Sequence, residues 1–283
     1  MTIWGQLRDA IGRHGAGALV TVVATRGSAP RDAGAAMVVT PEGYHGTIGG
    51  GALEWRAIAA AQAMLGKGRV SRRTSHALGP ELGQCCGGHV ELLTEVFDSG
   101  SLGEIQARMA RDAAQRRRIY LFGAGHVGRA LVLALAPLPF EVVWVDPRPS
   151  AFPAAMPANV TAVAPADVPG VLDEAPEGSL VFVMTHSHAL DLAIVEAALR
   201  SPAVAHTGLI GSATKRARFT RRLGEAGIDA SRIEALICPI GVSGIASKEP
   251  AMIALATAAQ IAVLHESLAS AAQQRPAAER TRA

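Results

Sequence analysis

The sequence predicts an α/β protein with a mixed amino-terminal α+β domain followed by a domain built on a parallel sheet. Its 283 residues are enough for two ordinary domains. The second half alternates strand-like and helical patterns, as parallel sheets covered by helices do. The motif Gly123-Ala-Gly-His-Val-Gly128 occurs between the first strand and first helix of that half. This glycine pattern is typical of nucleotide-binding turns, so we predict a Rossmann-like second domain.

The composition limits the class of protein. Hydrophobic residues make up 49% of the chain and aromatic residues only 4%, which predicts a core of aliphatic side chains. A net charge of +3 is too small to indicate nucleic-acid binding. Three cysteines cannot form a disulfide framework, so we expect a reducing, cytoplasmic location. The apolar segment Ala251–Leu264 is short for a membrane span, and we expect a buried helix of a soluble protein.

The amino-terminal domain is predicted over residues 1–98. A β-branched run ends at the breaker Gly27-Ser-Ala-Pro30, and Pro41-Glu-Gly43 is typical of a hairpin turn. Gly66 is a natural residue to end a helix. The expected strands are 18–25, 36–40, 44–48 and 89–97, and the expected helix covers about 52–65.

The remaining chain divides by composition. We predict a polar linker helix over 99–117, a Rossmann-like domain over 118–270, and a disordered tail of Ala, Gln, Arg and Pro over 271–283. The expected strands of the second domain are 119–122, 141–145, 180–184 and 206–210, and its expected helices are 126–136, 189–200, 213–226 and 249–268.

The fingerprint is the first candidate site. Gly123, Gly125 and Gly128 allow a tight turn and close approach of a phosphate to the helix that starts there. Asp146 ends the next strand and is placed to accept a ribose hydroxyl. His126 is bulky for a position along a pyrophosphate, which argues against an ordinary dehydrogenase. The alternative is a Rossmann fold whose nucleotide site is lost or used for another ligand.

The adjacent Cys85 and Cys86 form the second candidate site. They lie in the glycine-rich segment Leu82-Gly-Gln-Cys-Cys-Gly-Gly88. Thiolates are soft metal ligands and nucleophiles, suited to late metals, sulfur transfer or redox chemistry. The alternative is a pair of small buried hydrophobic residues. A zinc site is disfavoured, because there is no Cys-x-x-Cys pair and Cys238 is distant in sequence.

Three further segments carry polar chemistry. Successive N–H groups of Gly49, Gly50 and Gly51 are predicted to form an anion nest, with a plain strand-to-helix connection as the alternative. The segment Thr185–Asp191, which contains His186 and His188, follows a strand and so lies at the ligand-binding edge of the sheet. Its alternative role is to cap the next helix. Lys215 begins a basic helix that suits a phosphate or a solvated surface.

Together these motifs resemble one family. Seven occur in order between about residues 15 and 265: Gly27-Ser-Ala-Pro-Arg31, Gly46-Thr-Ile-Gly-Gly-Gly-Ala-Leu-Glu54, Gly83-Gln-Cys-Cys-Gly-Gly88, Gly123-Ala-Gly-His-Val-Gly128, Thr185-His-Ser-His-Ala-Leu-Asp191, Gly208-Leu-Ile-Gly-Ser212 and Cys238-Pro-Ile-Gly241. The succession resembles the XdhC/CoxI family, accessory proteins of xanthine dehydrogenase and related molybdenum hydroxylases.

The resemblance implies a chaperone rather than an enzyme. Such a protein binds the molybdopterin form of the molybdenum cofactor transiently, while a cysteine desulfurase supplies the terminal sulfido ligand of the metal. It then inserts the cofactor into the molybdenum subunit of apo xanthine dehydrogenase, in purine metabolism. The resemblance further implies molybdenum contact from Cys85 or Cys86, and pterin or phosphate contact from the glycine turns, His186, His188 and Lys215. Which domain holds the pterin stays open, and a homodimer is expected from the symmetry of the target.

Two other functions compete with the carrier. One is an NAD(P)-dependent oxidoreductase with a redox-active cysteine pair, although no general acid–base pair lies near the cysteines in sequence. The other is a metallohydrolase built on His186, His188 and Asp191, which lacks a further histidine after the acid. No nucleic-acid or membrane partner is expected.

Overall fold

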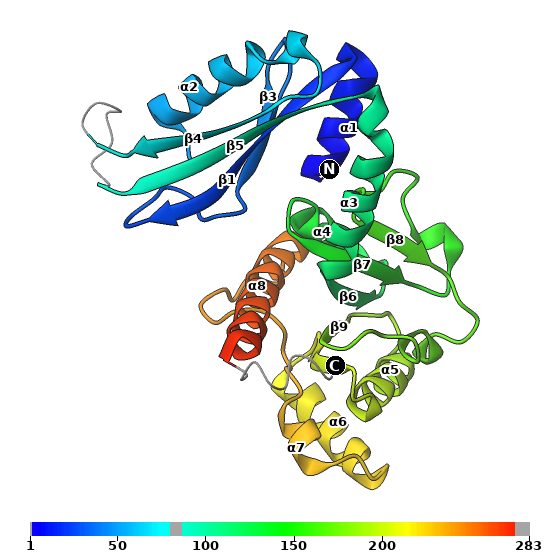
Figure 1. Cartoon of the computed structure of the whole chain (residues 1–283). Coiled ribbons are helices and arrows are strands. Elements are labelled where there is room, and N and C mark those ends of the chain that lie inside the picture. Colours follow the sequence, from blue (N-terminus) through cyan, green and yellow to red (C-terminus); the bar gives the residue numbers. More distant parts are fainter. Residues whose placement is uncertain (1, 80–86, 275–283) are drawn as a thin grey trace. The chain divides into compact units, whose positions relative to one another are not determined.

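The structure is a computed structural model that describes residues 2–79 and 87–274, and it divides into two compact units, Met1–Gln115 and Arg116–Ala283 (Figure 1). Helix α3 (Leu102–Gln115) falls in the first unit, where its Ile105 packs with Leu7 and Ile11 of helix α1 (Ile3–His14). The sequence predicts a linker helix over 99–117, and α3 lies within that range. It is amphipathic and buries its apolar side on α1.

The first unit is built on a five-stranded antiparallel sheet with the order β3-β2-β1-β5-β4. Helix α2 (Gly51–Gln62) covers one face, and α1 and α3 cover part of the other, so that each face has its own apolar core. The strands are β1 (Ala16–Arg26), β2 (Ala36–Val39), β3 (Tyr44–Gly46), β4 (Ser71–Ala77) and β5 (His89–Asp98).

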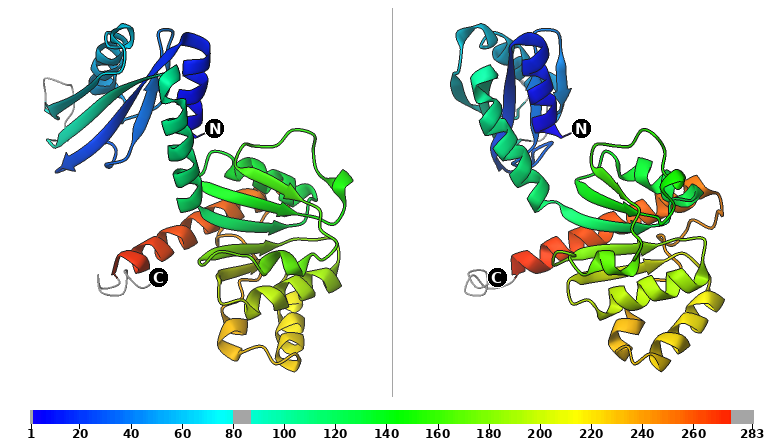
Figure 2. Two further views of the ribbon diagram at one scale, coloured as in Figure 1. Left: turned by 45° about the vertical axis from the view of Figure 1, so that its right-hand side comes forward. Right: turned by 90° about the vertical axis from the view of Figure 1, so that its right-hand side faces the viewer.

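The second unit is built on a five-stranded parallel sheet with the order β10-β9-β6-β7-β8 (Figure 2). The chain moves outward in one direction from β6 through β7 to β8, then in the other through β9 to β10. This is the strand order of a dinucleotide-binding domain, and it confirms the predicted Rossmann-like fold. The strands are β6 (Arg117–Phe122), β7 (Phe140–Val145), β8 (Val160–Val163), β9 (Ser179–Val183) and β10 (Val204–Leu209).

Helices cover both faces of the parallel sheet. On one face, Leu131 of α4 and Ile261 of α8 pack with Leu121 of β6. On the other face, Ile194 of α5 and Phe219 of α6 pack with Phe122. The helices are α4 (His126–Leu135), α5 (His188–Arg200), α6 (Ala213–Glu225), α7 (Ala230–Glu234) and α8 (Pro250–Gln274). Short 3-10 turns are η1 (Leu65–Lys67), η3 (Ser99–Ser101), η4 (Pro149–Ala151) and η5 (Pro169–Leu172).

Helix α8 differs from its prediction in length and burial. Its window Pro250–Ala271 has a mean hydropathy of 1.4 and 28% of it is buried, so by length and composition it could cross a membrane. Ala254, Ala258 and Ile261 on its inner side belong to the core of the second unit. It continues through Gln274, so residues 271–274 of the predicted disordered tail are helical. The rest of that tail lies outside the described residues.

Candidate functional site

The main candidate site lies in the second unit, where the loops that follow β6 and β9 meet. A Cβ atom on Gly123 would lie 2.4 Å from the carbonyl oxygen of Met184, and the φ of Gly123 is +113°. A Cβ on Gly128 would lie 2.1 Å from the carbonyl oxygen of Gly123. Both positions therefore require glycine for close packing. The two loops leave β6 and β9 at the switch point of the sheet, where Rossmann-like domains bind ligands.

Helix α4 begins at this switch point with an open amino terminus. Its N-cap, Gly125, supplies no capping side chain, and a Cβ there would have nothing within 4 Å. Gly125 and His126 are both exposed. Helices α5 and α6 are instead capped by Ser187 and Ser212, whose hydroxyls accept hydrogen bonds from Leu190 N and Lys215 N. Of these three helix starts, α4 presents N–H groups to an incoming anion.

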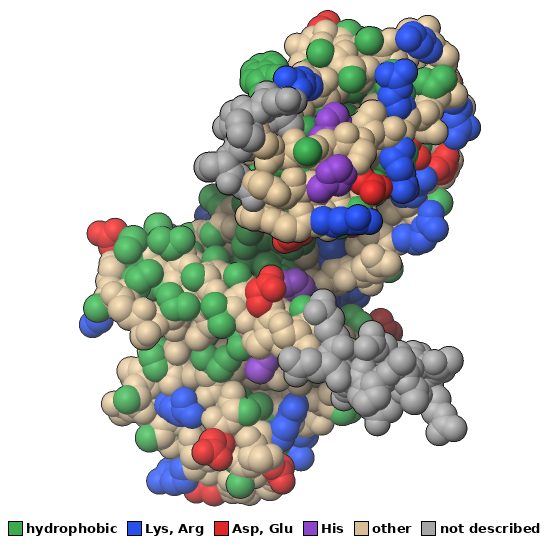
Figure 3. All heavy atoms as spheres, turned by 60° about the vertical axis from the view of Figure 1, so that its left-hand side comes forward, with side chains coloured by type: hydrophobic (Ala, Val, Ile, Leu, Met, Phe, Trp, Pro, Cys, Tyr) green, Lys and Arg blue, Asp and Glu red, His purple; other side chains and the backbone are tan. Residues whose placement is uncertain are grey.

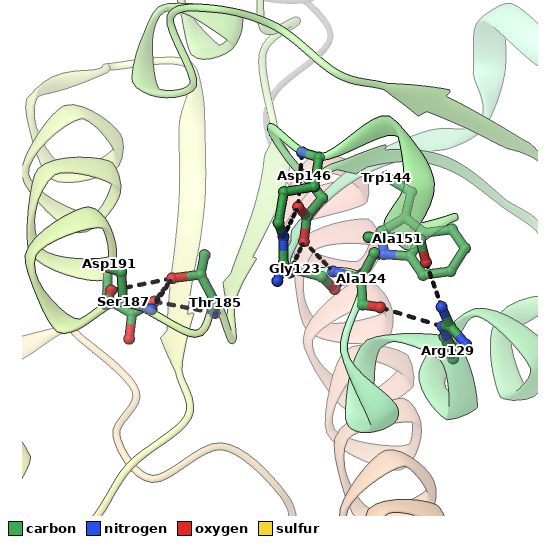
Figure 4. Close-up of polar contacts among 10 residues, drawn as sticks. Gly123, Ala124, Arg129, Trp144, Asp146, Ala151, Thr185, Ser187 and Asp191 are labelled. Atoms are coloured by element: carbon green, nitrogen blue, oxygen red, sulfur yellow. Dashed lines mark hydrogen bonds and ion pairs between the residues drawn. The ribbon is translucent and has the colours of Figure 1, made fainter. Parts of the chain in front are cut away.

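Asp146, predicted to hold a ribose hydroxyl, is instead engaged by its own chain (Figure 4). Its Oδ1 accepts from the backbone N–H and the Nε of Arg148 at 3.0 and 2.9 Å. Its Oδ2 accepts from Ala124 N and Arg148 Nη2, both at 2.8 Å. The side chain is 1% exposed. Burial alone would raise its pKa, but hydrogen bonds from Arg148 and Ala124 outweigh burial and hold the pKa at about 2. Asp146 thus orders the fingerprint loop rather than facing a ligand.

The loop after β9 is held by a second buried carboxylate. Asp191 is fully buried, and its Oδ1 accepts from Thr185 N and Thr185 Oγ1 at 3.1 and 2.7 Å (Figure 4). Its Oδ2 lies 2.7 Å from Lys215 Nζ, which also donates to the carbonyl oxygen of Ile210. Lys215, predicted to bind a phosphate, therefore forms a buried ion pair that ties α5 to α6.

The two histidines that follow β9 are accessible to a ligand. His186 and His188 are exposed, and Arg218 Nη2 lies 3.0 Å from His188 Nδ1. The helix is capped by Ser187, so neither His188 nor Asp191 is the N-cap. Within the described ranges, no group of three His, Cys, Asp or Glu side chains could hold a metal ion. With Asp191 turned inward as well, the geometry does not fit the metallohydrolase alternative.

The glycine turn of the first unit also differs from its prediction. Gly49, Gly50 and Gly51 all have positive φ, which favours glycine at these positions. The anion in that nest is the chain's own Glu54, whose Oε2 accepts from Ile48 N at 2.9 Å and Gly50 N at 3.2 Å. Burial raises its pKa, but the Thr47 hydroxyl and these backbone N–H groups together lower it below its ordinary value. The turn is closed by a side chain from α2 and is not an open anion site.

Three motifs of the first unit nevertheless converge. A Cβ on Gly49 would lie 2.6 Å from Pro30 Cγ, and a Cβ on Gly88 would lie 2.0 Å from the carbonyl oxygen of Ser28. Ser28 also bridges Gly87. The turn 49–51, the segment 27–31 and the carboxyl end of the cysteine loop therefore pack together. Cys85 and Cys86 themselves lie outside the described residues, and their proposed role stays a prediction.

Polar side chains beside the cysteine loop were not singled out from sequence. Ser75 Oγ lies 2.5 Å from His89 Nε2, across the β4–β5 pair that the loop connects. Burial, Arg56 and His89 lower the pKa of His76. Figure 3 shows histidine and basic side chains together on one face of this unit. The polar strand Ser71–Ala77 lacks an apolar alternation, so its pairing with β5 could not be predicted.

Comparison with known families identifies both units. A model of the XdhC Rossmann domain matches residues 119–261, and a model of the XdhC and CoxI family matches residues 10–75. The chain belongs to the XdhC and CoxI family.

Two individual proteins are similar to this chain. The chain is 29% identical over 255 residues to the Escherichia coli protein named "Uncharacterized protein YqeB", covering 86% of this chain and 42% of that protein. It therefore spans less than half the length of this curated relative. A crystal structure from Bacillus halodurans, described as a xanthine dehydrogenase, shares the fold with a TM-score of 0.75 at 20% identity, and the match covers 94% of this chain and 96% of that chain.

Proposed function

We propose that this XdhC and CoxI family member is a molybdenum-cofactor carrier of the cytoplasm. It binds the molybdopterin form of the cofactor as cargo and holds it while a cysteine desulfurase supplies a sulfido ligand to the metal. It then delivers the cofactor to the molybdenum subunit of apo xanthine dehydrogenase. The protein itself performs no turnover in this scheme.

The observation that carries the proposal is the open amino terminus of α4. Among the described residues no side chain caps this terminus, and none lies within 4 Å of a Cβ placed on Gly125. The terminal phosphate of a pterin cofactor suits such N–H donors and the positive end of the helix dipole. His126, the first residue of α4, and His186, in the loop after β9, are exposed and supply polar contacts to the same ligand.

The thiols are proposed to act on the metal. Cys85 and Cys86 lie between β4 and β5 in the sequence, shortly before Gly88, which packs against Ser28. Thiolates are metal ligands and nucleophiles, so either thiol is proposed to contact the molybdenum or its sulfido ligand. The third cysteine, Cys238, is buried, and burial raises the pKa of its thiol despite nearby Lys215 and Arg216. Cys238 is therefore a natural control and not a candidate for cofactor contact.

The NAD(P)-dependent oxidoreductase is the competing function, and one observation weighs against it. An NAD-binding domain uses the acid after its second strand for the ribose diol. Here both oxygens of Asp146 already accept hydrogen bonds from Arg148 and Ala124. A ribose diol would have to displace a guanidinium from a buried carboxylate. This cost favours a ligand that enters by its phosphate alone.

The test uses molybdenum cofactor freshly released from a donor enzyme. The purified chain is mixed with it, passed through a desalting column, and the retained pterin is oxidised and measured by fluorescence. We expect near-stoichiometric retention. Retention should fall at least about tenfold in Gly125→Val, because a side chain in that open space would exclude a phosphate. Gly224→Val, at another glycine with open space around it, is the matched control.

The cysteines are tested in the same assay. Cys85→Ala with Cys86→Ala should lower retention, while Cys238→Ala should retain the cofactor if it folds. Retention of NADH in place of the pterin, with hydride transfer to a purine or aldehyde, would overturn the carrier and support the oxidoreductase. Equal retention by the double cysteine variant would assign the thiols a structural role.

A further inference from the structure

A cavity lies in the Rossmann-like unit, at the edge of the sheet opposite to the amino terminus of α4. It is a cavity of about 380 Å³, within the range of small-molecule sites. It is bounded by the first residues of β6 and β10, the turn before β9 and the outer part of α8. Its walls are mostly small or apolar and include Ala203, Ala205, Leu268 and Ala271.

Among the described residues, Arg117 is the one cation that lines this cavity. Arg117, the first residue of β6, donates from Nη1 to the carbonyl oxygen of Gly178 at 2.6 Å and from Nε to His265 Nδ1 at 3.2 Å. Gly178 has a φ of +78°, and a Cβ there would lie 2.7 Å from Arg117 Nη1. The turn thus admits the guanidinium only because it has glycine at this position. The Nη2 group forms no hydrogen bond within residues 2–79 and 87–274.

The positive charge of Arg117 is not balanced by the groups that hold it. Its two hydrogen-bond partners are a carbonyl and an imidazole, and an Nδ1 that accepts a hydrogen bond belongs to a neutral histidine. Burial lowers the pKa of Arg117, and burial and Arg117 together lower the pKa of His206 on β10. Glu177, on the rim, is exposed and forms no ion pair with Arg117 within the described part of the chain. By contrast, Lys215 and Arg148 in the same unit each bind an aspartate.

We propose that this cavity binds a small organic carboxylate with a short apolar body, independently of the cofactor-carrier function. The free N–H groups of Arg117 receive the carboxylate, for which the planar guanidinium is well suited. The alanines and Leu268 then cover the apolar part of the ligand. A doubly charged phosphate fits less well, because Arg117 is the one cation that lines the cavity in the described residues. Glu177 at the rim further disfavours a dianion.

In the test, the whole purified chain is titrated with each probe compound. Binding is measured by isothermal titration calorimetry and by protection of the chain against thermal unfolding. Sodium butyrate is the probe. Butan-1-ol carries a neutral hydroxyl in place of the carboxylate, and inorganic phosphate is an anion without an apolar body. We expect saturable butyrate binding that is at least about tenfold tighter than binding of either comparison compound, the scale expected for a lost charged hydrogen bond.

Two variants examine the geometry. Arg117→Gln should lower butyrate affinity at least about tenfold, whereas Arg118→Gln, at the exposed neighbouring residue of β6, should leave it unchanged. Ala271→Trp keeps Arg117 and fills the cavity from an exposed position of α8, so it should also remove binding. It decides the case if Arg117→Gln does not fold.

Several outcomes would overturn the proposal: no saturable butyrate binding to the natural chain, equal binding of phosphate, or full butyrate binding by Ala271→Trp. None of them bears on the retention of molybdenum cofactor, which is measured separately and concerns the opposite edge of the sheet. The two proposals therefore fail independently.

Discussion

Two glycine turns of this protein look alike in sequence and differ in chemistry. Gly49–Gly51 leads from β3 into α2, and Gly123–Gly128 leads from β6 into α4. In the first, Glu54 returns from α2 to accept the backbone N–H groups of the turn. In the second, no side chain in the described part of the chain caps α4. A glycine turn before a helix is thus an anion site only if the helix does not supply its own carboxylate.

The second unit uses buried carboxylates in a different way. Asp146 and Asp191 accept backbone N–H groups from the loops after β6 and β9, as Glu54 does in the first unit. Each is also paired with a cation, Arg148 or Lys215. The two acids therefore hold the loops around the crevice without filling the helix terminus between them. Glu54 therefore binds the N–H groups of its own turn, whereas Asp146 and Asp191 hold the loops on either side of an uncapped helix terminus in the described part of the chain.

The largest expected effect on stability comes from the buried ion pair between Asp191 and Lys215. Lys215→Met leaves the fully buried Asp191 without its cation, and such a loss typically costs about 3–5 kcal/mol. Urea unfolding at neutral pH measures the loss. The double variant Lys215→Met with Asp191→Asn should recover part of it, because no uncompensated charge remains. Equal stability of the single and double variants would show that the ion pair does not frame the crevice.

The Glu54 carboxylate should contribute nearly as much to the free energy of unfolding. Glu54→Gln removes the charge that three donors of the first unit share, for an expected loss of about 2–3 kcal/mol of unfolding free energy at pH 7. Glu42→Gln, whose side chain is 82% exposed, is the matched control.

The pH dependence of this loss has a definite sign. The folded-state pKa of Glu54 is lowered, so its stabilisation is present above the ordinary pKa of 4.5 and is lost as the pH falls through the lower folded value. The difference between natural chain and variant should therefore narrow in acid. A difference that is constant from pH 7 to pH 3 would contradict the role of the ionised carboxylate.

A pair of glycine substitutions compares the two turns directly. Gly49→Ala places a Cβ against Pro30 at a φ of +128°, which should cost about 2 kcal/mol of stability. Gly125→Ala places one in open space at a φ of −77°, and the expected cost is about 0.5 kcal/mol or less. Thermal unfolding of both variants checks the contrast. Similar losses at both positions would mean that the fingerprint turn is as tightly packed as the closed one.

Much of the architecture could be predicted from local patterns. Strands β1, β5, β6 and β9 are long or apolar runs, and the fingerprint fixed the order of strand, turn and helix in the second unit. The strand Ser71–Ala77 and the four-residue strand Val160–Val163 were missed, since one is polar and the other is short. Helix α1 was missed as well, although Thr2 caps it.

The site was predictable in its glycines and not in its charges. Whether Asp146 faces a ligand depends on Arg148, two residues later, which folds back on it. Whether Lys215 is free depends on Asp191, 24 residues away on another helix. Such pairings arise from tertiary packing, so residue types and spacing alone suggested ligands where the fold supplies internal partners. Glu54 is the exception, because a buried acid one turn after a glycine nest is a local signal.

The last prediction concerns Asp146, the acid that directly follows β7. Asp146→Asn removes the charge but keeps an acceptor for Ala124 N, and Arg148 is half exposed, so the expected cost is about 1 kcal/mol at pH 7. Because the folded pKa of Asp146 is about 2, below its ordinary value of 3.8, its stabilisation is complete above pH 4 and is lost between about pH 4 and pH 2. Urea unfolding at pH 7, 4 and 3 should show the variant approaching the natural chain only at the lowest pH. If Asp146→Asn also bound NAD more tightly, the carboxylate would be blocking the ribose position. If its binding of molybdenum cofactor were unchanged, Asp146 would not contact the cofactor and would serve only to hold the fingerprint turn in place.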